Sequence, residues 1–301
     1  MARRRKGDPV HGWLVLDKPV GIGSTEAVSR ARRALRARKA GHAGTLDPLA
    51  SGALAIAFGE ATKTVPYVMD GEKRYEFGVR WGRATATDDL EGETVTESPR
   101  RPSEAEIRAA LPAFRGDILQ TPPAFSAVKV GGRRAYDLAR AGEGPDLAPR
   151  PLHVAALDLL AAERDEARFA LTCGKGGYVR AIARDLGEAL GCHGHVSALR
   201  RLSTGPFEVE DAVGWDALDR MEGRDPSLAL LPVSAALAPL PRVDLHPDEA
   251  ARLRNGNPVE ARGMAPDYGT TCWAALDGEA VAIGTYRAGR IHPQRVFVYG
   301  D

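Results

Sequence analysis

Cysteine and long apolar runs are scarce in this sequence of 301 residues. Its three cysteines, Cys173, Cys192 and Cys272, include no C-x-x-C pair, and an odd number cannot all pair within one chain. This usage favours a reduced, cytoplasmic setting over a disulfide-stabilised secreted protein. No stretch approaches the roughly 20 apolar residues that a membrane-spanning helix needs. The basic N-terminus is not followed by the apolar core of a signal peptide.

The sequence also lacks the short motifs that hold nucleotides and zinc. It contains no Walker A loop, no H-E-x-x-H, and no G-x-G-x-x-G where a nucleotide-binding fold would place one. The nearest approach to a metal cluster is the run from Cys192 to His195, whose crowding and missing partner pair favour ordinary structural residues. These absences predict a binding protein, or an enzyme that uses side chains alone without metal or cofactor.

Net charge is small but unevenly distributed. The chain has 41 Lys and Arg against 40 Asp and Glu, a formal charge of +1, which argues against a protein that coats nucleic acid through general positive charge. Residues 1–40 nevertheless hold 11 Lys and Arg against 3 Asp and Glu, and residues 168–205 hold 6 against 2. Two such blocks suit local binding of a polyanion, and solvated helix faces would give the same pattern.

Hydrophobic patterning predicts a mixed α+β protein, with a small β-rich segment after a Pro-containing linker near residue 236. Residues 73–81 alternate like a half-buried strand. Residues 24–39 follow a helical period, with Ser24 or Thr25 as the N-cap, and Ser103 with Glu106 matches a capping box. The other expected strands span residues 12–17, 53–58, 124–130, 152–160, 168–173, 271–276, 280–286 and 295–299, and the other expected helices span 61–69, 103–111, 134–140, 178–190 and 247–255.

The most informative segment is the loop at residues 41–52, GHAGTLDPLASG. Asp47-Pro48 alone is typical of an ordinary turn. Its setting favours a functional role for the loop. His42 precedes Asp47 by five residues, glycines permit close backbone approach, and a basic helix is expected directly upstream. An acid in a glycine-rich loop beside basic residues suits work on a nucleic-acid substrate.

This loop resembles the catalytic loop of the TruB-type tRNA pseudouridine synthases, and the resemblance recurs in order along residues 11–235, more weakly along 240–301. Two residues depart from the family pattern: Gly177 stands where Thr is usual, and Phe125 where Tyr is common. The matching blocks are LVLDKP at 14–19, GEATK at 59–63, KRY at 73–75, G-x-x-T-x-T-x-D-x-x-G at 82–92, and KGGYVR at 175–180 followed by DLG at 185–187.

The resemblance implies an α+β fold with a mixed, mostly antiparallel pseudouridine-synthase sheet core and flanking helices. It implies a catalytic domain at residues 1–236, with an RNA-clamping insertion at about 120–151, and a PUA-like RNA-binding domain at 237–301. The implied activity is conversion of uridine 55 in the tRNA T loop to pseudouridine. The implied enzyme is a cytoplasmic monomer that needs no cofactor, metal or protein partner.

The resemblance also assigns roles to single residues. Asp47 is implied as the catalytic carboxylate, Arg180 as the arginine that pairs with it, and Tyr75 as the ring that stacks on the uracil and helps to deprotonate C5. His42 is implied to fill the space that a flipped uridine leaves. The remaining implied substrate-binding or pocket residues are Asp89, Lys129, Tyr178 and Leu199.

Two questions stay open from the sequence. Asp47 could attack the base, attack C1′ or remove a proton from C2′. The chain could also be a non-catalytic tRNA-binding or tRNA-folding protein on the same scaffold, or a related synthase that acts on another RNA.

Overall fold

The computed structural model describes residues 7–221, 225, 229–263 and 266–300, which form two compact units. The first unit comprises the described parts of residues 1–47, 53–70 and 204–301, and the second comprises residues 48–52 and 71–203. No helix in the described ranges is long and apolar enough to cross a membrane. The domains expected at residues 1–236 and 237–301, with the insertion at about 120–151, remain predictions, because a compact unit is defined by packing and a domain by its independent fold.

A group of paired strands carries the candidate loop in the first unit. Strand β1 (Gly12–Lys18) pairs in parallel with β14 (Val213–Gly214) and neighbours β3 (Ala50–Phe58), which pairs antiparallel with β2 (Ala40–His42). Both β1 and β3 are almost wholly buried, as their continuous apolar runs predict, so the strands expected at 12–17 and 53–58 are confirmed. After β3 the chain forms a 3₁₀ turn, η1 (Gly59–Lys63), and helix α2 (Val65–Asp70).

Helix α1 (Ser24–Ala34) is shorter than the predicted 24–39. Its C-cap is Leu35, and Arg36 follows in a left-handed conformation with φ 48°. The amide of Ala37 donates to the carbonyl of Arg32, and the amide of Arg36 donates to that of Arg33. This is the Schellman pattern that ends many helices, usually with glycine at the left-handed position. An arginine takes that position here, so the sequence carried no glycine signal for the end.

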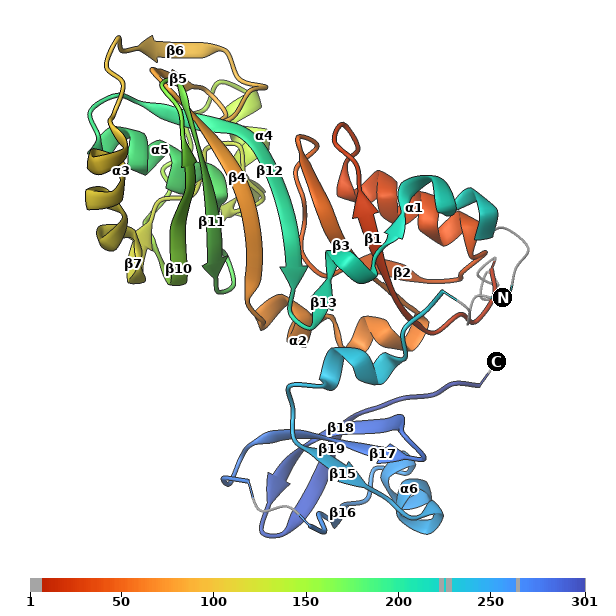
Figure 1. Cartoon of the computed structure of the whole chain (residues 1–301). Coiled ribbons are helices and arrows are strands. Elements are labelled where there is room, and N and C mark those ends of the chain that lie inside the picture. Colours follow the sequence, from red (N-terminus) through yellow and green to blue (C-terminus); the bar gives the residue numbers. More distant parts are fainter. Residues whose placement is uncertain (1–6, 222–224, 226–228, 264–265, 301) are drawn as a thin grey trace. The chain divides into compact units, whose positions relative to one another are not determined.

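The second unit is built on an antiparallel sheet with the strand order β12, β4, β11, β10, β7 (Figure 1). These strands span Gly194–Thr204 (β12), Lys73–Trp81 (β4), Glu166–Cys173 (β11), Arg150–Ala162 (β10) and Gly116–Gln120 (β7). The register places Tyr75 opposite Leu171 and Phe77 opposite Phe169, so alternate residues form one buried face. The strands expected at 73–81, 152–160 and 168–173 are confirmed.

The helices of this unit are α3 (Glu104–Ala110) and α5 (Val179–Ala189), together with α4 (Ala135–Arg140) in the insertion. The Ser103–Glu106 capping box is present, because each side chain bonds the backbone amide of the other residue. The strand expected at 124–130 is wrong except for β8 (Lys129–Val130), which pairs with β9 (Arg133–Arg134). Carbonyls of the preceding segment instead accept from the start of α4: Ser126 from Tyr136, and Val128 from Ala135.

A second sheet ends the chain, with the order β15, β17, β18, β19, β16 and helix α6 (Pro247–Arg254) beside it (Figure 1). Its strands span Arg242–Asp244 (β15), Val259–Glu260 (β16), Thr271–Leu276 (β17), Glu279–Arg287 (β18) and Arg290–Val296 (β19). The strands expected at 271–276 and 280–286 are confirmed. The one expected at 295–299 is correct only for residues 295 and 296, because the chain turns back at Ala288-Gly289, both with positive φ, and β19 runs from Arg290 to Val296.

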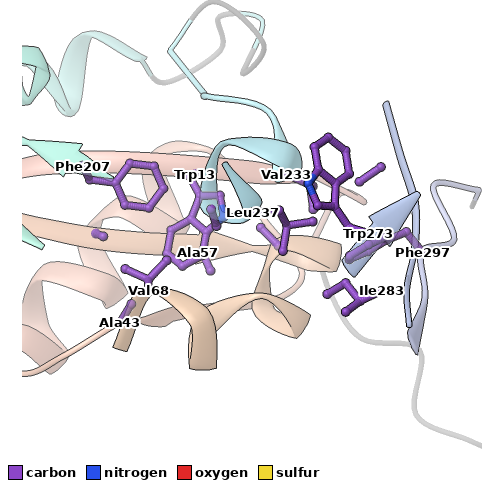
Figure 2. Packing of buried hydrophobic residues seen from close by; sticks show 14 of the residues in the cluster. Trp13, Ala43, Ala57, Val68, Phe207, Val233, Leu237, Trp273, Ile283 and Phe297 are labelled. Atoms are coloured by element: carbon purple, nitrogen blue, oxygen red, sulfur yellow. The ribbon is translucent and has the colours of Figure 1, made fainter. Parts of the chain in front are cut away.

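Strand β17 of this second sheet is buried on both faces. Trp273 of β17 packs in a cluster with Trp13 of β1 and Leu237 (Figure 2), and Ala275 belongs to the same cluster. Cys272 and Ala274 belong to a separate cluster with Ala250 and Leu253 of α6. Alternate residues of one strand therefore serve two cores. The remaining short elements are β5 (Arg83–Thr85), β6 (Thr94–Glu97), β13 (Phe207–Glu208), η2 (Leu111–Phe114), η3 (Val209–Asp211), η4 (Trp215–Ala217), η5 (Asp219–Met221) and η7 (Val233–Leu237).

Candidate active site

Asp47 lies in the loop of a β-hairpin in the first unit. The strands of the hairpin are β2 and β3, which pair from Ala40 opposite Phe58 to His42 opposite Ile56. Past the last pair, the amide of Ala43 still donates to the carbonyl of Ala55 over 2.9 Å. Ala43 and Leu46 are buried, whereas Asp47 is half-buried and Thr45 is exposed. The loop is thus anchored from within, and Asp47 itself is partly accessible to solvent.

Ser24 was expected to cap α1, as was Thr25, and both expectations are wrong. The N-cap is Gly23, with no side-chain hydrogen bond to the helix. The hydroxyl of Ser24 instead accepts from the amide of Leu46 and donates to the carbonyl of the same residue, each over 2.8 Å. The first turn of α1 is therefore bonded to the residue that precedes Asp47.

Gly52 closes this segment where β3 pairs in parallel with β12, opposite Arg201. Its φ is 101°, and a Cβ at this position would lie 2.2 Å from the carbonyl oxygen of Arg201. The close backbone approach that the glycines of the loop predicted is confirmed at this position. The approach is to a neighbouring strand, and it sets the register of Ala50 opposite Leu199.

Arg180 is a buried cation near the start of α5, in the second unit. Its guanidinium donates to the carbonyl of Thr87 over 2.8 Å and to that of Phe125 over 3.0 Å, and its Nε lies 3.6 Å from a carboxylate oxygen of Asp89. Asp89 is itself buried and accepts from the Thr87 hydroxyl and the Glu91 amide. A buried charge needs such partners to offset its lost hydration. The structure therefore brings together Arg180 and Asp89, two predicted site residues.

A second ion pair runs beside the first and was missed from the sequence. Arg184, one turn after Arg180, contacts Asp88 at 3.2 Å and donates to the carbonyl of Thr121 over 2.8 Å. Burial raises the pKa of Asp88 to about 6, against the lowering effect of Arg184. The sequence signal for this pair was the four-residue spacing of Arg180 and Arg184 on one helix, together with the consecutive aspartates Asp88 and Asp89.

Tyr178 is the N-cap residue of α5 and is half-buried. Its backbone makes both hydrogen bonds to the side-chain amide of Gln120: the Tyr178 amide donates over 2.9 Å, and the Gln120 amide group donates to the Tyr178 carbonyl over 3.2 Å. Gln120, Thr121 and Phe125 all bond α5, so the root of the insertion is tied to the helix that carries Arg180.

Tyr75 lies on the buried face of β4, next to β12. The guanidinium of Arg201 on β12 donates a hydrogen bond to the Tyr75 hydroxyl. Leu199 is also buried and, two residues before Arg201 on the same strand, shares its face. Tyr75, Leu199 and Arg201 therefore form one group. Arg201 was not predicted as a site residue, although its strand spacing from Leu199 pointed to it.

The remaining predicted residues lie elsewhere. His42 ends β2 and is half-buried, in the first unit with Asp47. Lys129 is exposed on β8 of the insertion, opposite Arg134. Close to it, the guanidinium carbons of two exposed arginines, Arg134 and Arg140, lie 5.7 and 5.6 Å from the ring of half-buried Tyr136.

His195 and Cys192, from the run that came nearest to a metal motif, have other surroundings. The ring of His195 bonds the carbonyl of Arg83 over 3.1 Å, and burial lowers the pKa of this histidine. Cys192 is buried with its thiol against the Gly187 carbonyl, and burial raises the pKa of the thiol. Both residues make contacts typical of structural positions.

The comparisons with known proteins bear on the whole chain. The model of the TruB family pseudouridylate synthase N-terminal domain matches residues 32–179, and that of the tRNA pseudouridylate synthase B C-terminal domain matches residues 180–238. The chain is 56% identical over 303 residues to the tRNA pseudouridine synthase B of Dinoroseobacter shibae, covering 100% of this chain and 99% of that protein. It is 55% identical to the protein of the same name in Paracoccus denitrificans, covering 99% of each.

Solved structures agree on the fold. A chain in the crystal structure of a Cbf5–Nop10–Gar1 complex matches with a TM-score of 0.73 and 26% identity, over 96% of this chain and 85% of that one. A chain of an archaeal box H/ACA Nop10–Cbf5 complex matches with a TM-score of 0.72 and 23% identity, over 100% of this chain and 93% of that one. The expected α+β pseudouridine-synthase fold is confirmed.

Proposed function

The chain belongs to the TruB family of pseudouridylate synthases and is an enzyme that isomerises uridine to pseudouridine in tRNA, and we propose that its target is uridine 55 of the T loop. The reaction breaks the N1–C1′ bond, turns the uracil and joins C5 to C1′. The hydrogen on C5 leaves as a proton and N1 gains one, so the isomerisation consumes neither a redox equivalent nor ATP.

In this proposal Asp47 supplies the catalytic carboxylate. The observation that carries the assignment is its place in a hairpin loop whose neighbouring residue is held by buried hydrogen bonds while Asp47 stays partly open. A fixed, ionised carboxylate serves as a nucleophile or stabilises an oxocarbenium-like centre. Chain connectivity supports the grouping of Asp47 with residues of β12. Ala50, three residues after Asp47, pairs with Leu199 of β12.

Arg180 is proposed as the cation that keeps Asp47 ionised and aimed, through charge and hydrogen bonding. Asp89 is proposed to act by holding Arg180, which agrees with their buried ion pair and with the two carbonyls that accept from the same guanidinium. Removing Asp89 would leave a buried charge short of a partner, so Asp89 matters to the site without touching the base.

Tyr75, Leu199 and Tyr178 are proposed to form the pocket for the uracil. Tyr75 stacks on the base and accepts the proton from C5, and Leu199 is an apolar wall. The shared face of Leu199 and the Tyr75–Arg201 pair supports this grouping. Tyr178 starts the helix that carries Arg180, which suits a residue beside the base.

A uridine in a folded T loop is stacked, so it must be turned out of the loop at a cost of roughly a few kcal/mol. His42 is proposed to fill the vacancy and offset part of this cost. Lys129 and the insertion at about 120–151 are proposed to close on the T arm, where exposed Lys129, Arg134 and Arg140 would meet phosphates.

The proposed division is a catalytic domain at 1–236 and a PUA-like domain at 237–301. We further propose that the enzyme acts in the cytoplasm, as a monomer, without a protein partner, metal or cofactor.

The test uses tRNA carrying tritium at C5 of its uridines and the purified protein alone. Wild type is expected to release one tritium per tRNA in a single turnover. Asp47→Asn should slow the release by more than about 10³-fold, because the amide is neither nucleophilic nor charged, with tRNA binding kept. Asp216→Asn, an exposed aspartate in the same unit, is the control and should match wild type.

A tRNA with cytidine at position 55 tests the target, and it should release no tritium. Release from that tRNA at the wild-type rate would refute the T-loop assignment. Equal release by wild type and Asp47→Asn would refute the role of the carboxylate.

A further inference from the structure

Ser24 makes an unusual pair of hydrogen bonds next to the candidate catalytic loop. Its hydroxyl accepts from the Leu46 amide and donates to the Leu46 carbonyl, both at 2.8 Å, across 22 positions of sequence. Only 4% of Ser24 and 4% of Leu46 is exposed. Both polar groups of one peptide residue are thus satisfied by one buried hydroxyl, as a neighbouring strand would satisfy them.

The first turn of α1 constrains the position of Ser24. It is the first residue of α1, and Gly23 serves as the N-cap, so the serine side chain is not used by the helix. Ala27, three residues on, is fully buried and donates its amide to the Gly23 carbonyl, which fixes the first turn against the core. A rigid helix end therefore holds the hydroxyl, as precise placement of a loop requires.

Leu46 directly precedes Asp47, so the position of its backbone fixes the position of the Asp47 Cα. The strand pairs of the hairpin stop at His42 opposite Ile56, and Ala43 bonds Ala55 just beyond them. Further along the loop, Ser24 supplies two bonds at one residue. Buried Leu46 and its two hydrogen bonds resist the shift of a loop that would otherwise sample several conformations.

We propose that Ser24 is a positioning residue for catalysis: its hydroxyl fixes the Leu46 backbone and thereby aims the Asp47 carboxylate. The inference rests on the proposed role of Asp47. Displacing a reacting group by about 1 Å costs on the order of 10²-fold in rate. Ser24→Ala should therefore lower the single-turnover rate at saturating tRNA by about 10- to 100-fold, with the tRNA dissociation constant changed by less than about threefold.

Two controls separate aiming from general stability. Thr25→Ala removes the neighbouring hydroxyl, which is exposed, and should leave the rate unchanged. Thr64→Val removes a buried hydroxyl of the same unit that bonds Trp13 and the Ala61 carbonyl, and it should lower the melting temperature while leaving the rate intact. Ser24→Cys keeps the volume with a weaker hydrogen-bonding group, should fall between wild type and Ser24→Ala, and carries the test if the alanine variant does not fold.

The outcomes are distinct for this inference and for the proposed function. If Asp47→Asn is inactive and Ser24→Ala, or Ser24→Cys in its place, keeps a rate within about twofold of wild type, the positioning role is overturned and the catalytic role of Asp47 stands. If Thr64→Val loses as much rate as the Ser24 variant at an equal fall in melting temperature, the effect is one of stability and the inference is also overturned. If Asp47→Asn is fully active, the proposed function fails first.

Discussion

Arg201 is a cation with almost no access to water, 2% exposed against 6% for Arg180. Burial lowers the pKa of the Arg201 guanidinium, and the Tyr75 hydroxyl, as its hydrogen-bond partner, acts in the opposite direction. The hydrogen bond from the Arg201 guanidinium restricts rotation of the Tyr75 hydroxyl. A fixed hydroxyl orientation suits the role proposed for Tyr75, which is to stack on the uracil and accept the proton from C5.

Replacing Arg201 by glutamine should therefore slow tritium release by about 100-fold, the lower end of the roughly 10²–10⁴-fold contribution of one acid–base group. In a Tyr75→Phe background the same replacement should cost much less, because the hydroxyl it acts on is gone. Single-turnover rates of the four proteins give this comparison. Arg200→Gln is the matched control. Arg200 directly precedes Arg201 on β12, and its guanidinium lies 3.5 Å from the Ser51 hydroxyl. Equal losses in both Tyr75 backgrounds would show that Arg201 acts independently of the tyrosine.

At the level of the element, α1 and the turn after it provide the basic surface that residues 1–40 predict. Not every charge is available to RNA: Arg30 bonds Asp219 over 2.7 Å and stacks on Trp215 at 4.2 Å. Arg32, Arg33 and Arg36 are exposed and line an open cavity of about 590 Å³. Arg36 also lies 3.5 Å from the carboxylate of Asp8, an exposed ion pair that contributes little and that a phosphate can replace. The left-handed turn at Arg36 keeps this arginine beside the last turn of the helix instead of carrying it one turn further.

Replacing Arg32, Arg33 and Arg36 together by alanine should weaken tRNA binding more than it lowers the rate at saturating tRNA. The slope of log affinity against log salt should become shallower by about 2, because each phosphate contact contributes roughly 0.7–0.9. Binding titrations between 50 and 200 mM salt measure it. Arg100, Arg108 and Arg168 form the control triple, since each is exposed but paired with a glutamate. A loss of slope equal in both triples would point to net charge alone.

At the level of the whole molecule, the C-terminal sheet shares a hydrophobic core with the strands that carry the candidate loop. Trp273, Ile283 and Phe297 pack in one cluster with Trp13 and Leu237 (Figure 2). Hydrogen bonds reinforce it, because Lys63 donates to the Val296 carbonyl over 2.8 Å and the Val298 amide donates to Glu60 over 2.8 Å. Within the first unit the sheet is thus part of the support for the hairpin.

Phe297→Ala should lower the free energy of unfolding by about 3–5 kcal/mol, the usual cost of emptying a buried phenylalanine site. Amide exchange should rise in β1 as well as in β18, because the cluster joins both strands. Chemical unfolding and hydrogen exchange test this, with Val298→Ala, 61% exposed, as the neighbouring control. Faster exchange confined to β15–β19 would show a sheet that is stable independently of β1.

Much of the fold and part of the site follow from local pattern. The alternation at 73–81 predicts β4, and the Ser103–Glu106 spacing predicts a capping box that is present. The motif segments around Asp47, Asp89 and Arg180 identify the family. The two basic segments, residues 1–40 and 168–205, can be counted directly in a chain that is almost neutral overall. Each of these signals lies within a few residues, where steric preference, hydrophobic period and motif spacing operate.

Other features depend on partners far away in sequence. The hydroxyl of Ser24 is a helix cap by its local setting, yet it bonds Leu46, 22 positions away. Arg36 occupies a left-handed position without glycine, because the hydrogen bonds of the helix end impose it. Arg201 meets Tyr75 only because β12 and β4 are neighbours, and the C-terminal strands find Trp13 only through packing. Local sequence determines which backbone conformations are low in energy, and long-range burial selects among them. A buried polar group needs a hydrogen-bond partner, and a buried apolar group needs close packing contacts.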